Sequence, residues 1–231
     1  MISKIKANVR ELGWINAFLY GLDRGFRRFA PALSVYRYYF VAQPVPEAAL
    51  LPPGRGATIM VRRLAEDDPA LRFLPVEERI VAARFRHDAV CFGAFRGETV
   101  IGCLWLCFDR YIEDEVASIF RPWPGDRACW DFDLYIDPKY RVGFAFARLW
   151  DTAYAYLRER GYRWTVSRIS AFNAVSLNSH AKLGAVRVGS LLVLRAGGVQ
   201  VSLSSLRPFI KIGMRKWAMP EYRIVVPGEA S

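Results

Sequence analysis

The chain of 231 residues is 53% hydrophobic and 14% aromatic, which is enough for a sizeable core and excludes wholesale disorder. Its 33 Lys and Arg residues outnumber its 22 Asp and Glu residues, and the net charge of +11 favours an anionic partner such as nucleic acid, anionic lipid or a phosphorylated cofactor. No segment has the ~20 consecutive apolar residues of a membrane span, and the amino-terminal residues lack the continuous apolar region of a signal peptide. We therefore expect a cytoplasmic protein.

Cysteine and histidine usage argues against a metal site. The four cysteines are Cys91, Cys103, Cys107 and Cys129. No pair has CxxC spacing, and on one straight strand Cys103 and Cys107 would lie roughly 13 Å apart, too far for a disulfide. Because His87 and His180 are the only histidines, we expect reduced core cysteines and no bound metal.

The amino-terminal segment has the pattern of an amphipathic helix. Apolar residues recur at helical spacing from Ile2 to Leu22, with Trp14 and Phe18 beside them and Lys and Arg along the edge. This pattern is typical of a helix in a membrane interface, where each basic residue near an anionic leaflet contributes about 1 kcal/mol. A helix packed on the domain, with a solvated basic edge, gives the same pattern, and both interpretations stay open.

A Pro- and Gly-rich stretch from Glu47 to Gly56 is typical of a linker. We therefore predict an amphipathic extension with its linker over residues 1–56 and a second domain over residues 57–231. In chain order, strands are expected at 36–41, 58–64, 89–95, 99–108, 130–136, 164–169, 186–194 and 199–203, and helices at 76–85, 143–160 and 174–183. This alternation predicts an α/β fold with a mixed (α+β) sheet and helices on its faces.

The loop before the helix expected at 143–160 suits a bound diphosphate. A helix amino terminus presents unpaired N–H groups and roughly half a positive charge. Arg141 adds positive charge there, and Gly143 and Ala145 are small enough for a phosphate to approach the backbone. An ordinary amphipathic helix after a strand is the plain alternative.

Together with a second motif over residues 173–185, this loop resembles the GNAT superfamily of N-acyltransferases, whose loop has the form Arg/Gln-x-x-Gly-x-Gly/Ala. The resemblance implies a GNAT-like acyltransferase fold and coenzyme A as the acyl carrier. It assigns cofactor binding to Arg141, Val142, Gly143, Phe144, Ala145, Phe146 and Asn173. Phe144 and Phe146 occupy the two glycine positions of the family, so the loop departs from the pattern, and acyl carrier protein stays open as the donor.

The second motif begins at Asn173 and ends in His180-Ala181-Lys182-Leu183-Gly184-Ala185, and it resembles a family pattern ending in Tyr-x-Lys-Leu-Gly-Phe. The resemblance implies that Asn173 contacts the pantetheine arm. It also places His180 where the family has a Tyr that protonates the departing thiolate. Imidazole has a reference pKa of ~6.5 and can do this near neutrality, although a structural helix histidine is an alternative.

An amine must lose its proton before it attacks a thioester, so a general base is required. Strand alternation would place Asp131, Asp133 and Tyr135 on one face of the strand before the loop. The family often places its base on this strand, so Asp131 and Asp133 are the candidates, in no fixed order. Structural pairing with an arginine such as Arg168 is the alternative for each.

The resemblance implies an acyl-CoA-dependent N-acyltransferase. The basic amphipathic extension and Phe144 and Phe146 favour a long-chain acyl donor and a lipid amine such as a sphingoid base, with peripheral contact at the anionic inner face of a membrane. In general character the chain is similar to the bacterial ceramide synthases. The acceptor, the acyl length and the oligomeric state stay open.

Two other functions compete with lipid acylation. One is N-acetylation of a soluble amine (an amino sugar, polyamine or amino acid), for which Glu113, Asp114 and Glu115 could hold a cationic acceptor unless they form a solvated face. The other is a non-catalytic basic protein that binds anionic surfaces. Nucleic acid is not expected as a partner, because the basic residues are scattered and no recognised binding motif is present.

Overall fold

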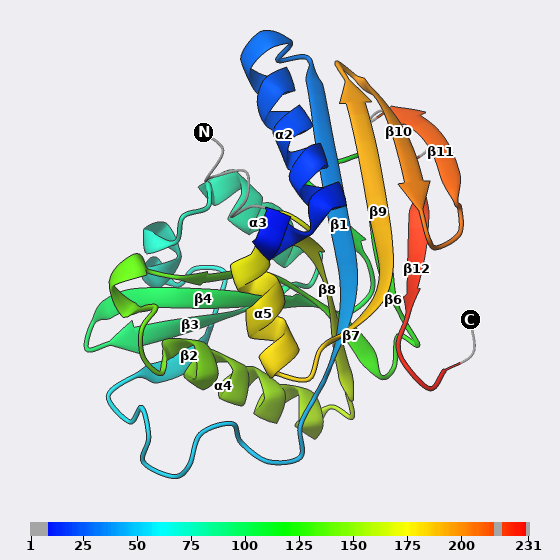
Figure 1. Cartoon of the computed structure of the whole chain (residues 1–231). Coiled ribbons are helices and arrows are strands. Elements are labelled where there is room, and N and C mark those ends of the chain that lie inside the picture. The colour runs from blue at the N-terminus through cyan, green and yellow to red at the C-terminus, as the bar shows by residue number, and fades with distance from the viewer. Residues whose placement is uncertain (1–8, 215–218, 230–231) are drawn as a thin grey trace. The chain divides into compact units, whose positions relative to one another are not determined.

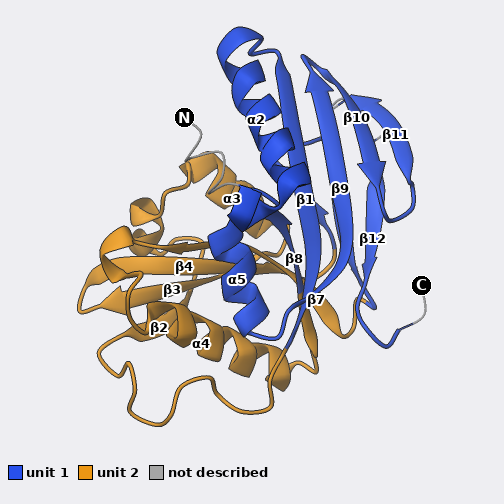
Figure 2. Cartoon of the chain, viewed as in Figure 1, with its two compact units in different colours: residues 1–44, 110–124, 166–231 blue, residues 45–109, 125–165 orange. Residues whose placement is uncertain are grey.

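The computed structural model describes residues 9–214 and 219–229, and its helices and strands are labelled in Figure 1. The chain forms two compact units (Figure 2). Unit 1 comprises Met1–Pro44, Arg110–Pro124 and Val166–Ser231, and unit 2 comprises Val45–Asp109 and Gly125–Thr165. Strands and helices occur in both units, which confirms the predicted α/β fold.

Unit 2 is built on four antiparallel strands. In sheet order they are β7 (Ala128–Ile136), β4 (Thr99–Cys107), β3 (Val90–Arg96) and β2 (Met60–Leu64). Its helices are the 3-10 turns η1 (Pro69–Phe73) and η2 (Pro138–Tyr140) and the α-helices α3 (Glu78–Arg86) and α4 (Ala145–Glu159).

Helix α4 is fixed to this sheet by one apolar face. Its buried residues recur at helical spacing and are Ala145, Leu149, Trp150, Ala153, Tyr154 and Leu157. They pack toward β2, β3 and β4. Because the buried face begins at the first residue of the helix, the packing also fixes where the amino terminus of α4 lies.

The described residues of unit 1 form strands of two sheets. The first has the order β11 (Ile210–Met214), β10 (Val199–Ser204), β9 (Val186–Ala196), β1 (Leu33–Pro44) and β8 (Trp164–Ser170), of which residues 166–170 belong to this unit. The second has the order β12 (Glu221–Val225), β6 (Ile119–Trp123) and β5 (Tyr111–Ile112), with β12 parallel to β6. The described part of the unit also includes the helices α2 (Trp14–Phe29) and α5 (Ala174–Lys182) (Figure 1).

Most predicted elements are present with ends shifted by a few residues. Strands β5, β6, β11 and β12 were not predicted from the sequence. Strand β1 lies within the predicted extension, pairs with β9 from Leu33 to Ala42 and is longer than expected. The boundary at residue 57 stays a prediction, and the part of the amino-terminal helix before Val9 lies outside the described residues.

Helix α2 packs on β1 through its polar side. The buried Asn16 amide donates to the Tyr39 hydroxyl, 2.9 Å away, and the buried Asp23 carboxylate accepts from the Val35 backbone N–H at 3.1 Å. On the other side of the helix Trp14 and other apolar side chains are exposed. None of the described helices is both long and apolar enough to cross a membrane.

Candidate active site

The two candidate carboxylates, Asp131 and Asp133, lie on β7 of unit 2, where the strand is irregular. The register of β4 against β7 shifts between Cys103 and Trp105, so β7 carries an extra residue after Phe132. Asp133 adopts the left-handed conformation, with φ of 46°. A bulge of this kind redirects the side chains that follow it.

Arg84 of α3 pairs with the Asp133 carboxylate at this bulge. Its guanidinium lies 5.0 Å from the ring centroids of both Trp105 and Phe132, which stack on each other. The Asp133 carboxylate therefore lies on the Phe132 side of β7, and Asp131, one residue before Phe132, points to the other side. The prediction that the two carboxylates share a face is wrong, because the bulge interrupts the alternation on which it relied.

The burial of the two carboxylates also differs. Asp131 is only 3% exposed, whereas about half of the Asp133 side chain is accessible. Burial raises the pKa of the neighbouring Cys129 thiol, and the negative charge of Asp131 raises it further. Burying a carboxylate is costly unless it has a partner or a role, so both positions qualify as functional candidates for different reasons.

The amino terminus of α4 is a potential anion site. Phe144 is the residue before the helix and makes no side-chain cap, and the first turn contains no acidic residue. Gly143 has φ of 150°, where a larger residue would be strained, and the Arg141 guanidinium donates to the Ile136 carbonyl at 3.1 Å. No acidic side chain of the first turn and no capping side chain therefore occupies the first N–H groups of the helix, which leaves them suited to an anion.

Two further arginines approach this end of the helix. The Arg55 guanidinium lies 5.9 Å from the Phe144 ring, and Arg148 donates to the Ile59 carbonyl at 3.4 Å. Gly56 allows the approach, because a Cβ there would lie 2.9 Å from the Cβ of Phe144. Together with Arg141, these side chains add positive charge where the helix dipole is also positive.

Helix α5 of unit 1 carries the second motif. Asn173 caps it by accepting from the Ser176 backbone N–H at 3.0 Å, which explains an asparagine at this position without a ligand. His180 is buried, and its Nδ1 lies 3.0 Å from Oε1 of Gln43 on β1. Because an amide oxygen only accepts, this contact requires the proton on Nδ1 and leaves Nε2 of the neutral ring as a proton acceptor.

A partly buried ion-pair network occupies another part of unit 1. Arg168 contacts Glu113 through two nitrogens, at 2.6 and 2.7 Å, and contacts Glu115 at 3.0 Å. The Tyr38 hydroxyl donates to Glu115 at 2.9 Å, and burial raises the Tyr38 pKa. Glu113 is therefore part of an internal network and not of a solvated face, and the arginine that pairs with Asp133 is Arg84 instead of Arg168.

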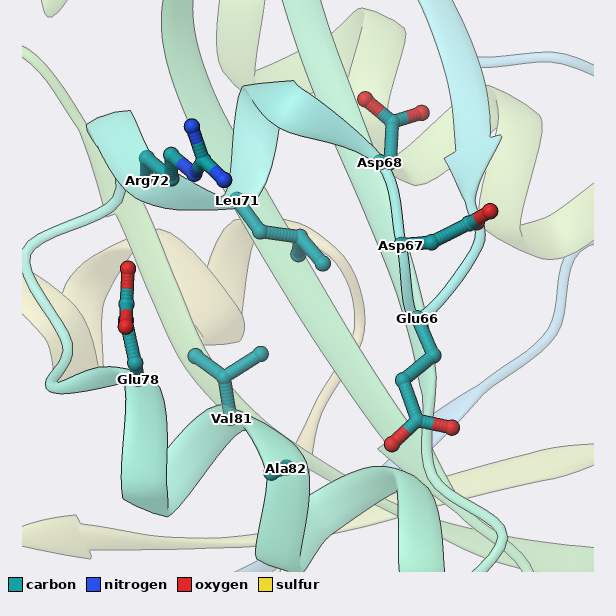
Figure 3. A pocket seen from close by; sticks show the side chains of 8 residues that line it. All are labelled: Glu66, Asp67, Asp68, Leu71, Arg72, Glu78, Val81 and Ala82. Atoms are coloured by element: carbon teal, nitrogen blue, oxygen red, sulfur yellow. The ribbon is translucent and has the colours of Figure 1, made fainter.

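Unit 2 also has an acidic hollow of about 290 Å³ (Figure 3). Four carboxylates line it, those of Glu66, Asp67, Asp68 and Glu78, together with Arg72 and apolar side chains. Hydrogen bonding to Arg62 lowers the pKa of Asp68, so this carboxylate stays ionised. The hollow has the charge to attract a cation. Among the described residues, no cluster of three or more His, Cys, Asp or Glu side chains could hold a metal ion.

The predicted site residues fall into both units. Unit 2 carries Asp131, Asp133 and the loop from Arg141 to Phe146, and unit 1 carries Asn173 and His180. Sequence reasoning missed Arg84 and Gln43, which contact candidate residues from distant elements and carry no motif. It also missed Arg55 and Arg148. Gly54 and Gly56, on either side of Arg55, were an available signal, because a glycine often stands where two parts of the backbone come close, as Gly56 and Phe144 do.

Comparison with known proteins gives a consistent result. The family model described as "Acetyltransferase (GNAT) family" matches residues 59–185, more than half of the chain. No curated protein sequence matches. A putative GNAT acetyltransferase from Novosphingobium aromaticivorans is similar in structure, with a TM-score of 0.50 and 17% identity over 70% of this chain and 66% of that one.

Two other solved structures match with lower TM-scores. A functionally unknown protein from Staphylococcus epidermidis gives a TM-score of 0.49, with 8% identity over 75% of this chain and 66% of that one. An aminoglycoside acetyltransferase from an uncultured soil metagenomic sample gives 0.41, with 13% identity over 55% of this chain and 88% of that one. The chain spans just under two thirds of the length of the first two structures. Because the matched residues run from β2 to α5 and include the α4 loop and both motifs, the chain belongs to the GNAT acetyltransferase family.

Proposed function

We propose that the protein transfers an acyl group from acyl-CoA to a primary amine by direct attack of the amine on the thioester. The observation that carries this proposal is the uncapped amino terminus of α4, surrounded by Arg55, Arg141 and Arg148 in a chain of the GNAT family. Helix N–H groups and guanidinium groups are donors that suit a diphosphate. The diphosphate of coenzyme A would bind to the loop from Arg141 to Phe146, and Asn173 would contact the pantetheine arm.

In the reaction, the amine nitrogen bonds to the thioester carbon as the bond from carbon to sulfur breaks. One proton leaves the attacking amine and one is taken up by the thiolate. Asp133 is accessible enough to accept the amine proton directly, whereas the buried Asp131 would act through a water molecule. Both remain candidates for the general base.

His180 is the proposed proton donor to the thiolate. Since its Nδ1–H is directed at Gln43, Nε2 is the nitrogen that exchanges protons with the substrate. Nε2 can donate only when the ring is an imidazolium, and it becomes an acceptor after the transfer. Gln43 would act as a positioning residue that fixes the orientation of the ring.

For the acceptor we propose a lipid amine such as a sphingoid base, acylated from a long-chain acyl-CoA at the inner face of a membrane. The outward aromatic side chains of α2 and the partly exposed Phe144 beside the donor loop support this choice. Acyl carrier protein is an alternative donor.

A soluble polyamine or amino sugar is the second candidate acceptor. The acidic hollow around Glu66, Asp67 and Glu78 favours it, because its carboxylates would attract several ammonium groups at once (Figure 3). The third alternative is a non-catalytic protein that binds anionic surfaces and acylates neither kind of amine.

These acceptors are distinguished by measuring free thiol released from acetyl-CoA and from palmitoyl-CoA, each with a sphingoid base and with a polyamine. We expect rapid release with palmitoyl-CoA and the sphingoid base. Turnover confined to acetyl-CoA and the polyamine would overturn the proposal of a lipid amine as acceptor but would support N-acyl transfer. No release in any pairing, without a thermal shift from either donor, would overturn the enzymatic proposal itself.

A further inference from the structure

One face of the strands β9, β10 and β11 is apolar and exposed. Across the antiparallel pairs, Leu194 lies opposite Val201, which lies opposite Ile212. Ile210 and Ile212 on β11 are 69% and 68% exposed. The apolar sheet face, as defined here, consists of Leu192, Leu194, Val199, Val201, Leu203, Ile210, Ile212 and Met214.

Strand β10 buries its polar side chains and exposes its apolar ones, the opposite of an ordinary surface strand. Its polar residues Gln200 and Ser202 are buried, and Gln200 hydrogen-bonds the backbone of Ala117 from both ends of its amide. The alternating residues Val199 and Leu203 are the ones exposed. Exposing apolar residues while burying polar ones is costly in water and marks an interaction surface.

Helix α2 lies on the same side of this sheet. It contacts β1 through the bond from Asn16 to Tyr39, and Tyr39 shares a strand face with Val35, whose partner on β9 is Leu194. Figure 1 shows α2 over β1 and no helix over β9, β10 and β11 on that side. Among the described residues, α2 therefore covers only the β1 part of this face.

Helix α2 likewise turns polar residues toward the sheet and apolar residues outward. Asn16 and Asp23 are turned inward, whereas Trp14 is 73% exposed and Phe18 and Phe29 are also exposed. Trp and Phe side chains on a basic helix are typical of the boundary between headgroups and acyl chains. The two elements lie on the same side of the sheet, and together we call them the docking surface: the outer side of α2 and the apolar sheet face.

The charge around the docking surface is almost entirely positive. Arg24, Arg27 and Arg28 of α2 are exposed, whereas Asp23 is buried and bonded to Arg27. From Arg160 to Pro220 the sequence contains no Asp or Glu at all. An apolar surface with a positive rim is complementary to a bilayer that carries anionic headgroups.

We propose that the docking surface binds an anionic lipid bilayer, with the sheet face and α2 contacting it together. A symmetric dimer through the same surface would bring the arginines of α2 against their own copies, which like-charge repulsion opposes. Nucleic acid would leave the apolar side chains unmatched. The proposal adds a partner surface to the proposed function and does not depend on the acyl-transfer chemistry.

Co-sedimentation of the full chain with vesicles tests this directly. We expect binding to phosphatidylcholine vesicles that contain phosphatidylglycerol, weaker binding without it, and further weakening as salt is raised. Replacing Ile210 and Ile212 together by Ser should reduce the apparent affinity by about tenfold or more. Phe73→Ser removes a side chain that is 75% exposed but lies in unit 2, and it should leave binding unchanged.

Three results would overturn the proposal: no sedimentation of the wild type with anionic vesicles, equal binding by the double Ile→Ser variant, or an equal loss in Phe73→Ser. A dimer in solution that the double Ile→Ser variant abolishes would assign the surface to a second copy and overturn it as well. Circular dichroism would confirm that both variants fold. Turnover of palmitoyl-CoA with a detergent-solubilised sphingoid base, in the absence of vesicles, separates the failure of this proposal from the failure of the proposed function.

Discussion

Arg84 holds the carboxylate of Asp133 at the bulge where β7 leaves its regular register with β4. The guanidinium is itself fixed between two stacked rings, those of Trp105 and Phe132. The position of Asp133 therefore depends on α3 as well as on its own strand. Asp131, two residues earlier, is buried and lies on the other side of β7.

This difference leads to a paired prediction for the general base. Asp131→Asn and Asp133→Asn keep the shape of the side chain but remove its ability to accept a proton. The variant that lacks the base should lose turnover by about 10²-fold or more with little change in donor binding, and the other should lose much less. Steady-state kinetics with acyl-CoA check this. Near-normal turnover in both variants would remove the two aspartates from the mechanism.

A second prediction concerns His180 and Gln43. His180→Ala should reduce turnover by about 10²-fold or more, because no proton donor remains for the thiolate. Gln43→Leu should cause a smaller loss, since the ring stays but loses the acceptor that orients it. His180→Tyr supplies the residue type that the family resemblance expects and should restore much of the turnover. If His180→Ala is as active as the wild type, the histidine is structural.

A third prediction tests the donor loop with a matched pair of glycines. Gly54 and Gly56 both have positive φ, of 79° and 69°, so Ala is strained at both, by about 1–2 kcal/mol. Only at Gly56 would the new Cβ also collide with Phe144, which precedes α4. We expect Gly56→Ala to weaken donor binding clearly more than Gly54→Ala, as measured by isothermal titration with CoA. Equal effects would show that the loop tolerates displacement.

A fourth prediction concerns stability. Glu113 is fully buried and is one of two carboxylates that pair with the partly buried Arg168, so Glu113→Gln should lower the free energy of unfolding by about 1.5–3 kcal/mol, because two charge-assisted hydrogen bonds are weakened. Glu115→Gln alters a half-exposed member of the same network and should cost about 1 kcal/mol or less. Urea denaturation of the two variants provides the comparison. A larger loss for Glu115→Gln would contradict this description of the network.

A fifth prediction is chemical. All four cysteines are free and buried, and burial raises the pKa of each thiol. Since the thiolate is the reactive form, they should react slowly with a disulfide reagent in the folded protein and fully in denaturant. Rapid labelling of the native protein would contradict this. The same reagent can then report CoA release without interference from the protein.

The fold was largely predictable where periodicity and a motif coincide. The strand at β7, the loop beginning at Arg141 and both following helices were recovered, because their apolar residues repeat with a clear period and their ends carry glycine or asparagine. Strands β6 and β12 were not recovered. They are short, β6 contains Pro122, and their parallel pairing joins segments far apart in the sequence.

The details of the site were less predictable. The bulge at Asp133 is set by pairing with β4, and its partner Arg84 comes from α3, so neither is visible within β7 itself. In α2 the apolar stripe was correctly recognised, but periodicity does not reveal which side faces the sheet. That side is chosen by the hydrogen bonds of Asn16 and Asp23.

The balance of products would show whether the protein transfers an acyl group from coenzyme A to an amine. Palmitoyl-CoA and a sphingoid base are incubated with the protein, and the free CoA and the N-acylated amine are quantified together by mass spectrometry. We expect equal amounts of the two products, both lost to the same extent in the aspartate variant that lacks the base. Release of CoA without any amide from any amine acceptor would mean hydrolysis and would contradict N-acyl transfer.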